Sequence, residues 1–184
     1  NLFLHVVGRR PDGYHLLQTL FRLVDHGDTL RFALRTDGRI LRFRPLAGVP
    51  EERDLCLRAA RLLQEASGCR HGVEIALEKR LPMGGGLGGG SSDAATVLLA
   101  MNRLWGLNWP RERLQALGLQ LGADVPFFIG GHNAFVEGIG ERLAPLALPR
   151  QWFAVVKPAT GLATEPIFKH PALVRDTPAV ILSG

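Results

Sequence analysis

The chain has 184 residues, of which 46% are hydrophobic and 21% charged, and its mean hydropathy is +0.09. This balance is typical of a folded globular protein and excludes a disordered chain, while the longest apolar stretch, 94–101, is far shorter than the roughly 20 residues of a membrane span. A net charge of +5 suits an anionic partner. The arginines are scattered among acids, however, which favours a solvated surface over a face that binds nucleic acid.

The first part of the chain is predicted to be rich in strands. Apolar runs predict a buried strand over 2–7 and two further strands over 28–34 and 40–43. The last two are separated by Thr36-Asp37-Gly38, which predicts a tight turn that joins them. The pattern over 14–24 is mixed, and no single element is predicted there.

A helix followed by a strand is predicted in the middle of the chain. Apolar residues recur at helical spacing over 54–66, with Asp54 as the expected N-cap and Gly68 as the residue that ends the helix. Alternating apolar residues over 73–77 then predict a strand.

Two more helices and one more strand are predicted in the remaining sequence. The first helix covers 93–105, and the second begins with Pro110 as its first residue and runs to Gly122. A strand is expected over 152–156, after a domain boundary near Leu148. Two cysteines, Cys56 and Cys69, match no metal-ligand spacing, and a reducing cytoplasm is the expected compartment.

A run of glycines separates the predicted strand at 73–77 from the helix at 93–105. Residues 82–93 are Pro-Met-Gly-Gly-Gly-Leu-Gly-Gly-Gly-Ser-Ser-Asp. Glycine loses more backbone entropy on folding than other residues, so such a run implies that the backbone approaches a partner closely or takes positive φ angles. Phosphate suits exposed N–H groups at the start of a helix, and Ser91 and Ser92 could cap that helix or offer hydroxyls to phosphate or Mg²⁺. A flexible linker is the weaker alternative, because a strong helix follows at once.

Two familiar phosphate-binding motifs do not account for the run. A Walker A loop requires a lysine after the last glycine, and none follows here. The dinucleotide fingerprint fits Gly84, Gly86 and Gly89, but any sequence so dense in glycine satisfies it, and the acid expected about 20 residues later is absent.

The segment from Pro82 to Ala95 resembles the second motif of the GHMP kinases. The segments Asp12-Gly-Tyr-His15 and Gly122-Ala-Asp-Val-Pro126 are similar to those of members that phosphorylate the 2-hydroxyl of the cytidyl diphosphate of methylerythritol in the non-mevalonate isoprenoid pathway. The resemblance implies an α+β GHMP-kinase fold, with a two-layer α/β nucleotide-binding domain over 1–148 and the start of a ferredoxin-like C-terminal domain over 149–184. It also implies a cytoplasmic transferase that uses ATP with Mg²⁺ on a small-molecule substrate, without nucleic acid or a membrane as partner.

The resemblance also assigns roles to individual residues. It makes Asp124 the catalytic base, which accepts the proton of the attacked hydroxyl; on the residues alone, Asp124 would be taken as a cap of the turn before Val125. Tyr14 and Phe168 would stack on the cytosine, and His15 would hydrogen-bond its polar edge. Without the resemblance, Phe168 would be assigned to the core and His15 to the surface. The remaining assignments are Asn1 and Thr164 on the substrate side, and on the ATP side Lys79, Pro82, Met83, Gly84, Gly85, Gly86, Leu87, Gly88, Gly89, Gly90, Ser91 and Ser92.

Alternatives and departures accompany this assignment. Another GHMP kinase, of homoserine or mevalonate type, is the runner-up, and a basic nucleic-acid-binding α/β domain is the candidate from a different class. The family places a lysine before the position of Asn1 and a third glycine-rich motif near its C-terminus, and this sequence contains neither. We therefore expect the 184 residues to be a piece of a longer protein, with little turnover by themselves. The oligomeric state and the metal ligands are left open.

Overall fold

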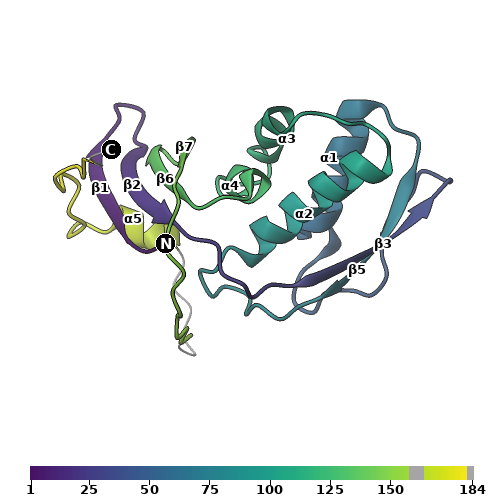
Figure 1. Cartoon of the computed structure of the whole chain (residues 1–184), viewed down its shortest axis with the longest axis horizontal. Coiled ribbons are helices and arrows are strands. Elements are labelled where there is room, and N and C mark those ends of the chain that lie inside the picture. Colours follow the sequence, from purple (N-terminus) through teal and green to yellow (C-terminus); the bar gives the residue numbers. More distant parts are fainter. Residues whose placement is uncertain (158–163, 182–184) are drawn as a thin grey trace. The chain divides into compact units, whose positions relative to one another are not determined.

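The computed structural model describes residues 1–157 and 164–181, which form two compact units (Figure 1). The first unit combines residues 1–23 with the chain from His132 onward, and the second comprises Val24–Gly131. The chain thus leaves the first unit, builds the second and returns. The expected division into 1–148 and 149–184 stays a prediction, because the two units of the structure are divided at other positions.

The first unit is built on a four-stranded antiparallel sheet (Figure 1). In sheet order its strands are β1 (Leu4–Arg9), β2 (His15–Phe21), β6 (Ala134–Gly138) and β7 (Arg142–Pro145). The predicted first strand is confirmed, whereas β2, β6 and β7 were not predicted. The expected strand over 152–156 is wrong, because this stretch has no ladder partner and its side chains are exposed.

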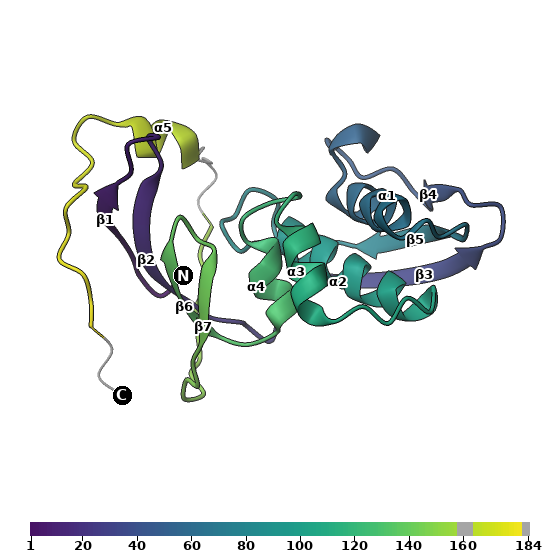
Figure 2. The ribbon, with the colours of Figure 1, turned by 90° about the horizontal axis from the view of Figure 1, so that it is seen from above.

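The C-terminal stretch is attached to the first unit by hydrogen bonds across the sheet. After α5 (Thr164–Lys169), the chain passes beside β1 (Figure 2), where the amide of Thr177 donates to the carbonyl of Val6 at 3.0 Å. The amide of Val180 donates to Oε1 of the buried Gln18 at 2.7 Å, and Gln18 Nε2 donates to Glu137 at 2.8 Å. These bonds attach residues 177–180 to β1 and β2.

The second unit has a three-stranded sheet in the order β3, β5, β4. The strands are β3 (Thr29–Arg35), β4 (Ile40–Arg42) and β5 (Gly72–Glu78), with β5 antiparallel to β3 and parallel to β4. The prediction that β3 and β4 pair through a turn is therefore wrong. β5 lies between them because its Val73 and Ile75 are completely buried, which a central strand satisfies and an edge strand does not.

Four α-helices accompany this sheet. They are α1 (Leu55–Ser67), preceded by the short η1 (Glu51–Arg53), α2 (Gly89–Leu104), α3 (Arg111–Gly118) and α4 (Val125–Gly130). The predicted caps of α1 are confirmed: Asp54 accepts from the amides of Cys56 and Leu57, and Gly68 ends the helix with φ 66°. The predicted second helix is shorter than expected, and Pro110 is its N-cap rather than its first residue.

The core of the second unit lies where α1 and α2 cover one face of the sheet (Figure 1). Its largest completely buried side chains come from every layer: Leu57, Leu63, Ile75, Leu98, Met101, Leu114 and Ile129. Each such side chain contributes about 1.5–3 kcal/mol by leaving water, so α2 is held firmly along its length.

Within the described ranges, no helix combines the length and apolarity that crossing a membrane requires.

Candidate functional sites

The glycine run joins β5 to α2 in the second unit, and α2 begins inside it. Gly88 is the N-cap with φ 67°, and its carbonyl accepts from the amide of Ser92 at 2.9 Å. No side chain caps this helix, so the expectation that Ser91 or Ser92 would do so is wrong: both lie in the first turn. The first amides of α2, at the glycine-rich end, have no intrahelical acceptor, and the helix dipole adds about half a positive charge there.

The glycines of the run serve two different needs. A Cβ on Gly88 would lie 2.8 Å from the ring of Phe128, so this position is glycine because the helix start packs tightly against α4. A Cβ on Gly84 would meet nothing within 4 Å, although φ there is 66°. Gly84 lies inside a turn that the bond from the amide of Gly85 to the carbonyl of Pro82 closes at 3.3 Å, and the space beside it is open to an incoming ligand.

A pocket of about 340 Å³ opens over this loop, within the second unit. The residues that were predicted to bind ATP all line it except Ser92. The pocket is lined by Arg42, Leu46, Val49, Arg53, Asp54, Leu55, Cys56, Leu77, Lys79, Pro82, Met83, Gly84, Gly85, Gly86, Leu87, Gly88, Gly89, Gly90, Ser91 and Asp93. Its walls therefore combine backbone amides, apolar side chains and a few charged groups, as small-molecule sites do.

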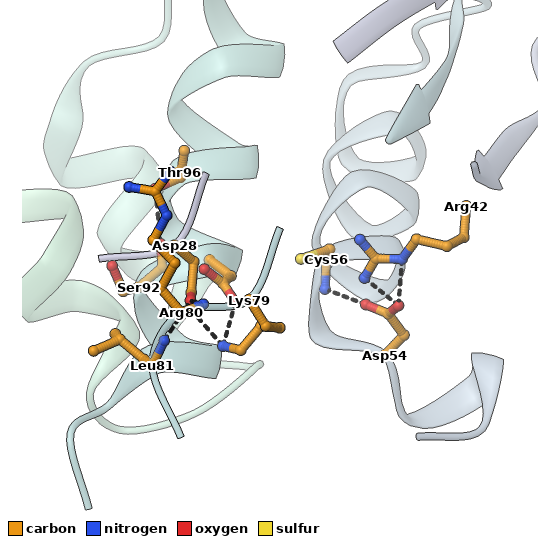
Figure 3. A network of polar contacts seen from close by, with 10 residues as sticks. Asp28, Arg42, Asp54, Cys56, Lys79, Arg80, Leu81, Ser92 and Thr96 are labelled. Atoms are coloured by element: carbon orange, nitrogen blue, oxygen red, sulfur yellow. Dashed lines mark hydrogen bonds and ion pairs between the residues drawn. The ribbon is translucent and has the colours of Figure 1, made fainter. Parts of the chain in front are cut away.

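Lys79 is held between two carboxylates at the entrance to the glycine run (Figure 3). Its Nζ donates to Asp28 at 2.5 Å and to Asp93 at 3.1 Å, and the three side chains are 18%, 1% and 6% exposed, respectively. The second oxygen of Asp28 accepts from the amides of Arg80 (2.6 Å) and Leu81 (2.8 Å). This network ties the segment before the loop to the start of β3 and to the first turns of α2.

The network shifts the pKa of each member in a direction set by its surroundings. Burial raises the pKa of Asp93 to about 6, and the nearby ammonium of Lys79 only partly opposes this. Burial also acts on Asp28, but its bonds from Lys79 and from two backbone amides outweigh that effect and lower its pKa. For Lys79, the same two carboxylates overcome burial and raise the pKa, so its ammonium stays charged.

A second buried ion pair lies at the base of α1 (Figure 3). Arg42 and Asp54 are 7% and 5% exposed, and Arg42 Nε donates to Asp54 at 2.8 Å. Arg42 Nη1 is buried without a partner among the described residues, and Arg42 lines the pocket. The neighbouring Cys56 thiol interacts with Arg42, and because burial raises its pKa to about 12 it stays neutral and is only a weak acceptor for this guanidinium. Arg42 was not singled out from the sequence, although its position two residues after the buried Ile40, on the same face of β4, was a usable signal.

Asp124 stands immediately before α4, in the second unit. It occupies the N-cap position, yet its side chain makes no capping bond, so the carboxylate is not engaged by the helix. The residue is exposed, but the surrounding protein still withdraws enough water from the carboxyl group to raise its pKa above the usual value for aspartate. An exposed carboxylate with a raised pKa is chemically suited to accept a proton.

A second pocket, of about 550 Å³, lies in the first unit. It is lined by Arg9, Asp12, Gly13, Tyr14, His15, Leu17, Ile139, Phe168, Lys169 and Arg175. Three residues that were predicted to hold a cytosine therefore meet in one pocket: Tyr14 is 61% exposed, and the rings of His15 and Phe168 lie 5.2 Å apart at 39°. Such a pocket offers aromatic surfaces for a flat ring and polar groups for its edge.

The other predicted substrate residues are not brought into this pocket. Asn1 is exposed at the start of the chain, and it does not line the pocket. Thr164 begins α5, and its side chain lies outside what the structure describes. Their roles stay predictions. Arg175, by contrast, was not singled out from the sequence, and its bonds to His15 and to Phe168 could not be anticipated because His15 is 160 residues away.

The chain is similar to known proteins of one family. Residues 54–132 match the GHMP kinases N terminal domain. Curated relatives named 4-diphosphocytidyl-2-C-methyl-D-erythritol kinase, from Ralstonia nicotianae and Methylibium petroleiphilum, are 63% and 64% identical over 183 residues. The alignments cover 100% of this chain and 63% of each relative, so the chain spans less than two thirds of their length.

Solved structures agree with this. A crystal structure of 4-(cytidine 5'-diphospho)-2C-methyl-D-erythritol kinase matches 81% of this chain and 53% of its own, with a TM-score of 0.71 and 50% identity. A homoserine kinase from Cytophaga hutchinsonii matches 88% of this chain and 52% of its own, with a TM-score of 0.54. Its 19% identity shows the shared fold alone. The expected α+β GHMP-kinase fold is confirmed.

Proposed function

We propose that the chain belongs to the GHMP kinases, whose N terminal domain matches residues 54–132, and that the full-length protein transfers the γ-phosphate of ATP to the 2-hydroxyl of 4-diphosphocytidyl-2-C-methyl-D-erythritol. The observation that carries this proposal is the glycine loop, which opens into α2 and forms the wall of a pocket. Bare amides at the positive end of a helix are suited to hold a polyphosphate.

Two observations on the pocket support ATP as its ligand. The space over Gly84 is open where a side chain would otherwise stand, so phosphate oxygens could approach the backbone closely. The buried and unpartnered Nη1 of Arg42 is a donor that an acceptor on a bound ligand would satisfy. In this proposal Lys79, which lines the same pocket, lies near the adenosine, while its two carboxylates keep it in place.

Mg²⁺ is proposed to accompany the nucleotide. Among the described residues, no group of three or more His, Cys, Asp and Glu side chains is placed to hold a metal ion. Kinases commonly bind Mg²⁺ through the phosphates with only one or two protein ligands, so this fits an ion carried by ATP. Bound there, Mg²⁺ would neutralise charge on the phosphates, and the hydroxyls of Ser91 and Ser92 in the first turn of α2 could contribute oxygen ligands.

Asp124 is proposed as the base that accepts the proton of the attacked hydroxyl. Phosphoryl transfer depends mainly on positioning and on charge stabilisation, with a carboxylate to receive the hydroxyl proton. Two observations support this role. The carboxylate of Asp124 makes no capping bond to α4, as it would if the residue were only a helix cap, and its raised pKa makes it a stronger base.

The cytidyl end of the substrate is proposed to bind in the pocket of the first unit. Tyr14 and Phe168 would provide the stacking surfaces, and His15 would bond the edge of the base. This pocket also favours the proposed substrate over homoserine and mevalonate, which have no base to stack. Both cysteines are free, which supports the reducing cytoplasm as the compartment.

The test is ATP consumption by the full-length protein with three candidate substrates. We expect turnover with 4-diphosphocytidyl-2-C-methyl-D-erythritol to exceed that with homoserine or mevalonate by at least about 10³-fold, because sites built to hydrogen-bond a group reject analogues that lack it. Comparable turnover with homoserine or mevalonate would refute the substrate assignment. The absence of turnover with all three would refute the proposed activity.

A further inference from the structure

The guanidinium of Arg175 connects the C-terminal stretch to His15 at the start of β2. Its Nε donates to Nε2 of His15 at 3.1 Å. Its Nη1 donates to the carbonyl of Leu173 at 2.9 Å, and its Nη2 donates to the carbonyls of His170 (2.9 Å) and Phe168 (3.2 Å). The backbone carbonyls hold Arg175 in one orientation, so the bond to His15 comes from a fixed donor.

This bond determines where His15 carries its proton. An arginine side chain has donors only, so Nε2 of His15 must be the acceptor and therefore unprotonated. A neutral imidazole then has its single proton on Nδ1. Withdrawal from water, Arg175 and Arg9 all lower the pKa of His15, which favours the same neutral ring. The other ionisable groups that line this pocket are Asp12, Tyr14 and Lys169.

We propose that Arg175 is a positioning residue that fixes His15 as the neutral Nδ1–H tautomer, so that the pocket offers a donor to a bound base and prefers cytosine to uracil. The inference rests on the proposed function, because it assigns the base to this pocket. N3 of cytosine is an acceptor, whereas N3 of uracil carries a proton, so a fixed donor pairs with the first and opposes the second. Nδ1 of His15 has no partner within the described part of the chain, so its N–H is available to a ligand.

The expected size of the preference for cytosine over uracil follows from the free-energy cost of placing two N–H donors against each other. Leaving a buried donor unsatisfied costs about 1–3 kcal/mol, which corresponds to about 5- to 150-fold in affinity. Without Arg175, the His15 ring is free to place its proton on Nε2 instead, and Nδ1 then accepts a hydrogen bond from N3–H of uracil. The preference for cytosine should therefore disappear with Arg175, even where some binding persists.

The test uses the ring nitrogen signals of His15 in the ¹⁵N NMR spectrum of the full-length protein, identified by their absence in His15→Asn. We expect a protonated Nδ1 and an unprotonated Nε2. Titration with CDP and with UDP, followed at these signals, should show CDP binding about 10- to 100-fold more tightly. Because the signals belong to His15, nucleotide bound at the glycine loop does not contribute to the result.

Arg175→Met removes every donor while keeping a flexible, unbranched side chain. It should bring the affinities for CDP and UDP within about threefold of each other and raise the pH at which His15 titrates. Arg142→Gln is the matched control, because Arg142 is exposed on β7 and does not line the pocket; it should keep the preference. If Arg175→Met does not fold, two other measurements test the inference: the tautomer of His15 in the wild type, and the preference of Arg175→Lys for CDP. A lysine at this position keeps a donor but not the planar fork, so this variant should lose at least part of the preference for CDP over UDP.

Three results would overturn the inference: a proton on Nε2 in the wild type, no preference for CDP over UDP, or an unchanged preference in Arg175→Met. Each of these is separable from the proposed function, because the kinase assay reports turnover and the NMR titration does not require it. A protein that shows the predicted tautomer and the CDP preference but no turnover would refute the kinase activity and leave the role of Arg175 intact.

Discussion

The carboxylate of Asp124 precedes α4 without capping it, and its pKa is raised. In the full-length protein, we expect Asp124→Asn to lower kcat by about 10²- to 10⁴-fold, because an amide cannot accept the hydroxyl proton. The affinity for ATP should change by less than about twofold. Steady-state kinetics and a nucleotide-binding titration would measure both.

A matched control for this change is Asp37→Asn. The exposed Asp37 lies in the turn between β3 and β4, where it pairs with the half-buried Arg35 and does not line the glycine-loop pocket. Its loss should leave kcat unchanged, since exposed ion pairs contribute little. If Asp124→Asn retains the wild-type kcat, Asp124 has no part in proton transfer.

The start of α2 is the element on which the proposed nucleotide site depends, and its glycines are not equivalent. Both Gly84 and Gly88 have positive φ, which costs an alanine roughly 1–2 kcal/mol, but only at Gly88 would a Cβ collide with the Phe128 ring. We expect Gly88→Ala to lower the free energy of unfolding by about 1–3 kcal/mol more than Gly84→Ala, measured by urea denaturation.

A double variant separates the collision from the backbone strain. Adding Phe128→Leu to Gly88→Ala should recover part of the extra loss, because the smaller side chain vacates the space that the new Cβ needs. Equal destabilisation by the two single alanine variants would contradict the tight packing between α2 and α4.

The Asp28–Lys79–Asp93 network predicts a pH dependence of the same element. The folded-state pKa of Asp93, about 6, lies above the ordinary aspartate value of 3.8, so the folded protein binds this proton more tightly than the unfolded chain does. The resulting stability is fully present below about pH 3.8 and is lost as the pH rises through about 6. We therefore expect the free energy of unfolding of the wild type, relative to Asp93→Asn, to rise as the pH falls from 7 to 4.

Denaturation of both proteins at several pH values would measure this difference. The titration of Asp28 does not interfere in this pH range. Because its pKa is lowered, the stability that its ionised form contributes is lost only at more acidic pH. A difference between wild type and variant that stays constant from pH 7 to pH 4 would show that folding leaves the pKa of Asp93 unshifted, contrary to its burial.

The elements that the sequence predicted well are those whose signals are local. α1 was predicted with its caps because Asp54 and Gly68 stand at its two ends, and the glycine loop was predicted because a dense run of glycines directly before a strong helix indicates a close approach to the backbone. The order β3-β5-β4 was missed because pairing depends on which strand α1 and α2 cover, which no local turn signal reports. Arg42 and Arg175 were missed because their partners are fixed by the fold.

At the scale of the whole molecule, the chain covers 63% of the length of relatives such as that of Ralstonia nicotianae. We expect the isolated 184 residues to turn over substrate at least about 100-fold more slowly than the full-length protein, because they span only 63% of the length of such a relative. A comparison of the two proteins in the ATP-consumption assay would measure this. Comparable turnover would show that the rest of that length is dispensable.

The interrupted first unit imposes an order on folding during synthesis. β2 ends at Phe21 and pairs with β6, which begins at Ala134, so this sheet cannot close until the ribosome has released more than a hundred further residues. The intervening residues 24–131 are continuous and contain their own core, so they can complete their packing while β1 and β2 still wait for a partner. The nascent chain therefore carries an unpaired edge on β2 until β6 has been synthesised, and such an edge is exposed to aggregation during that interval.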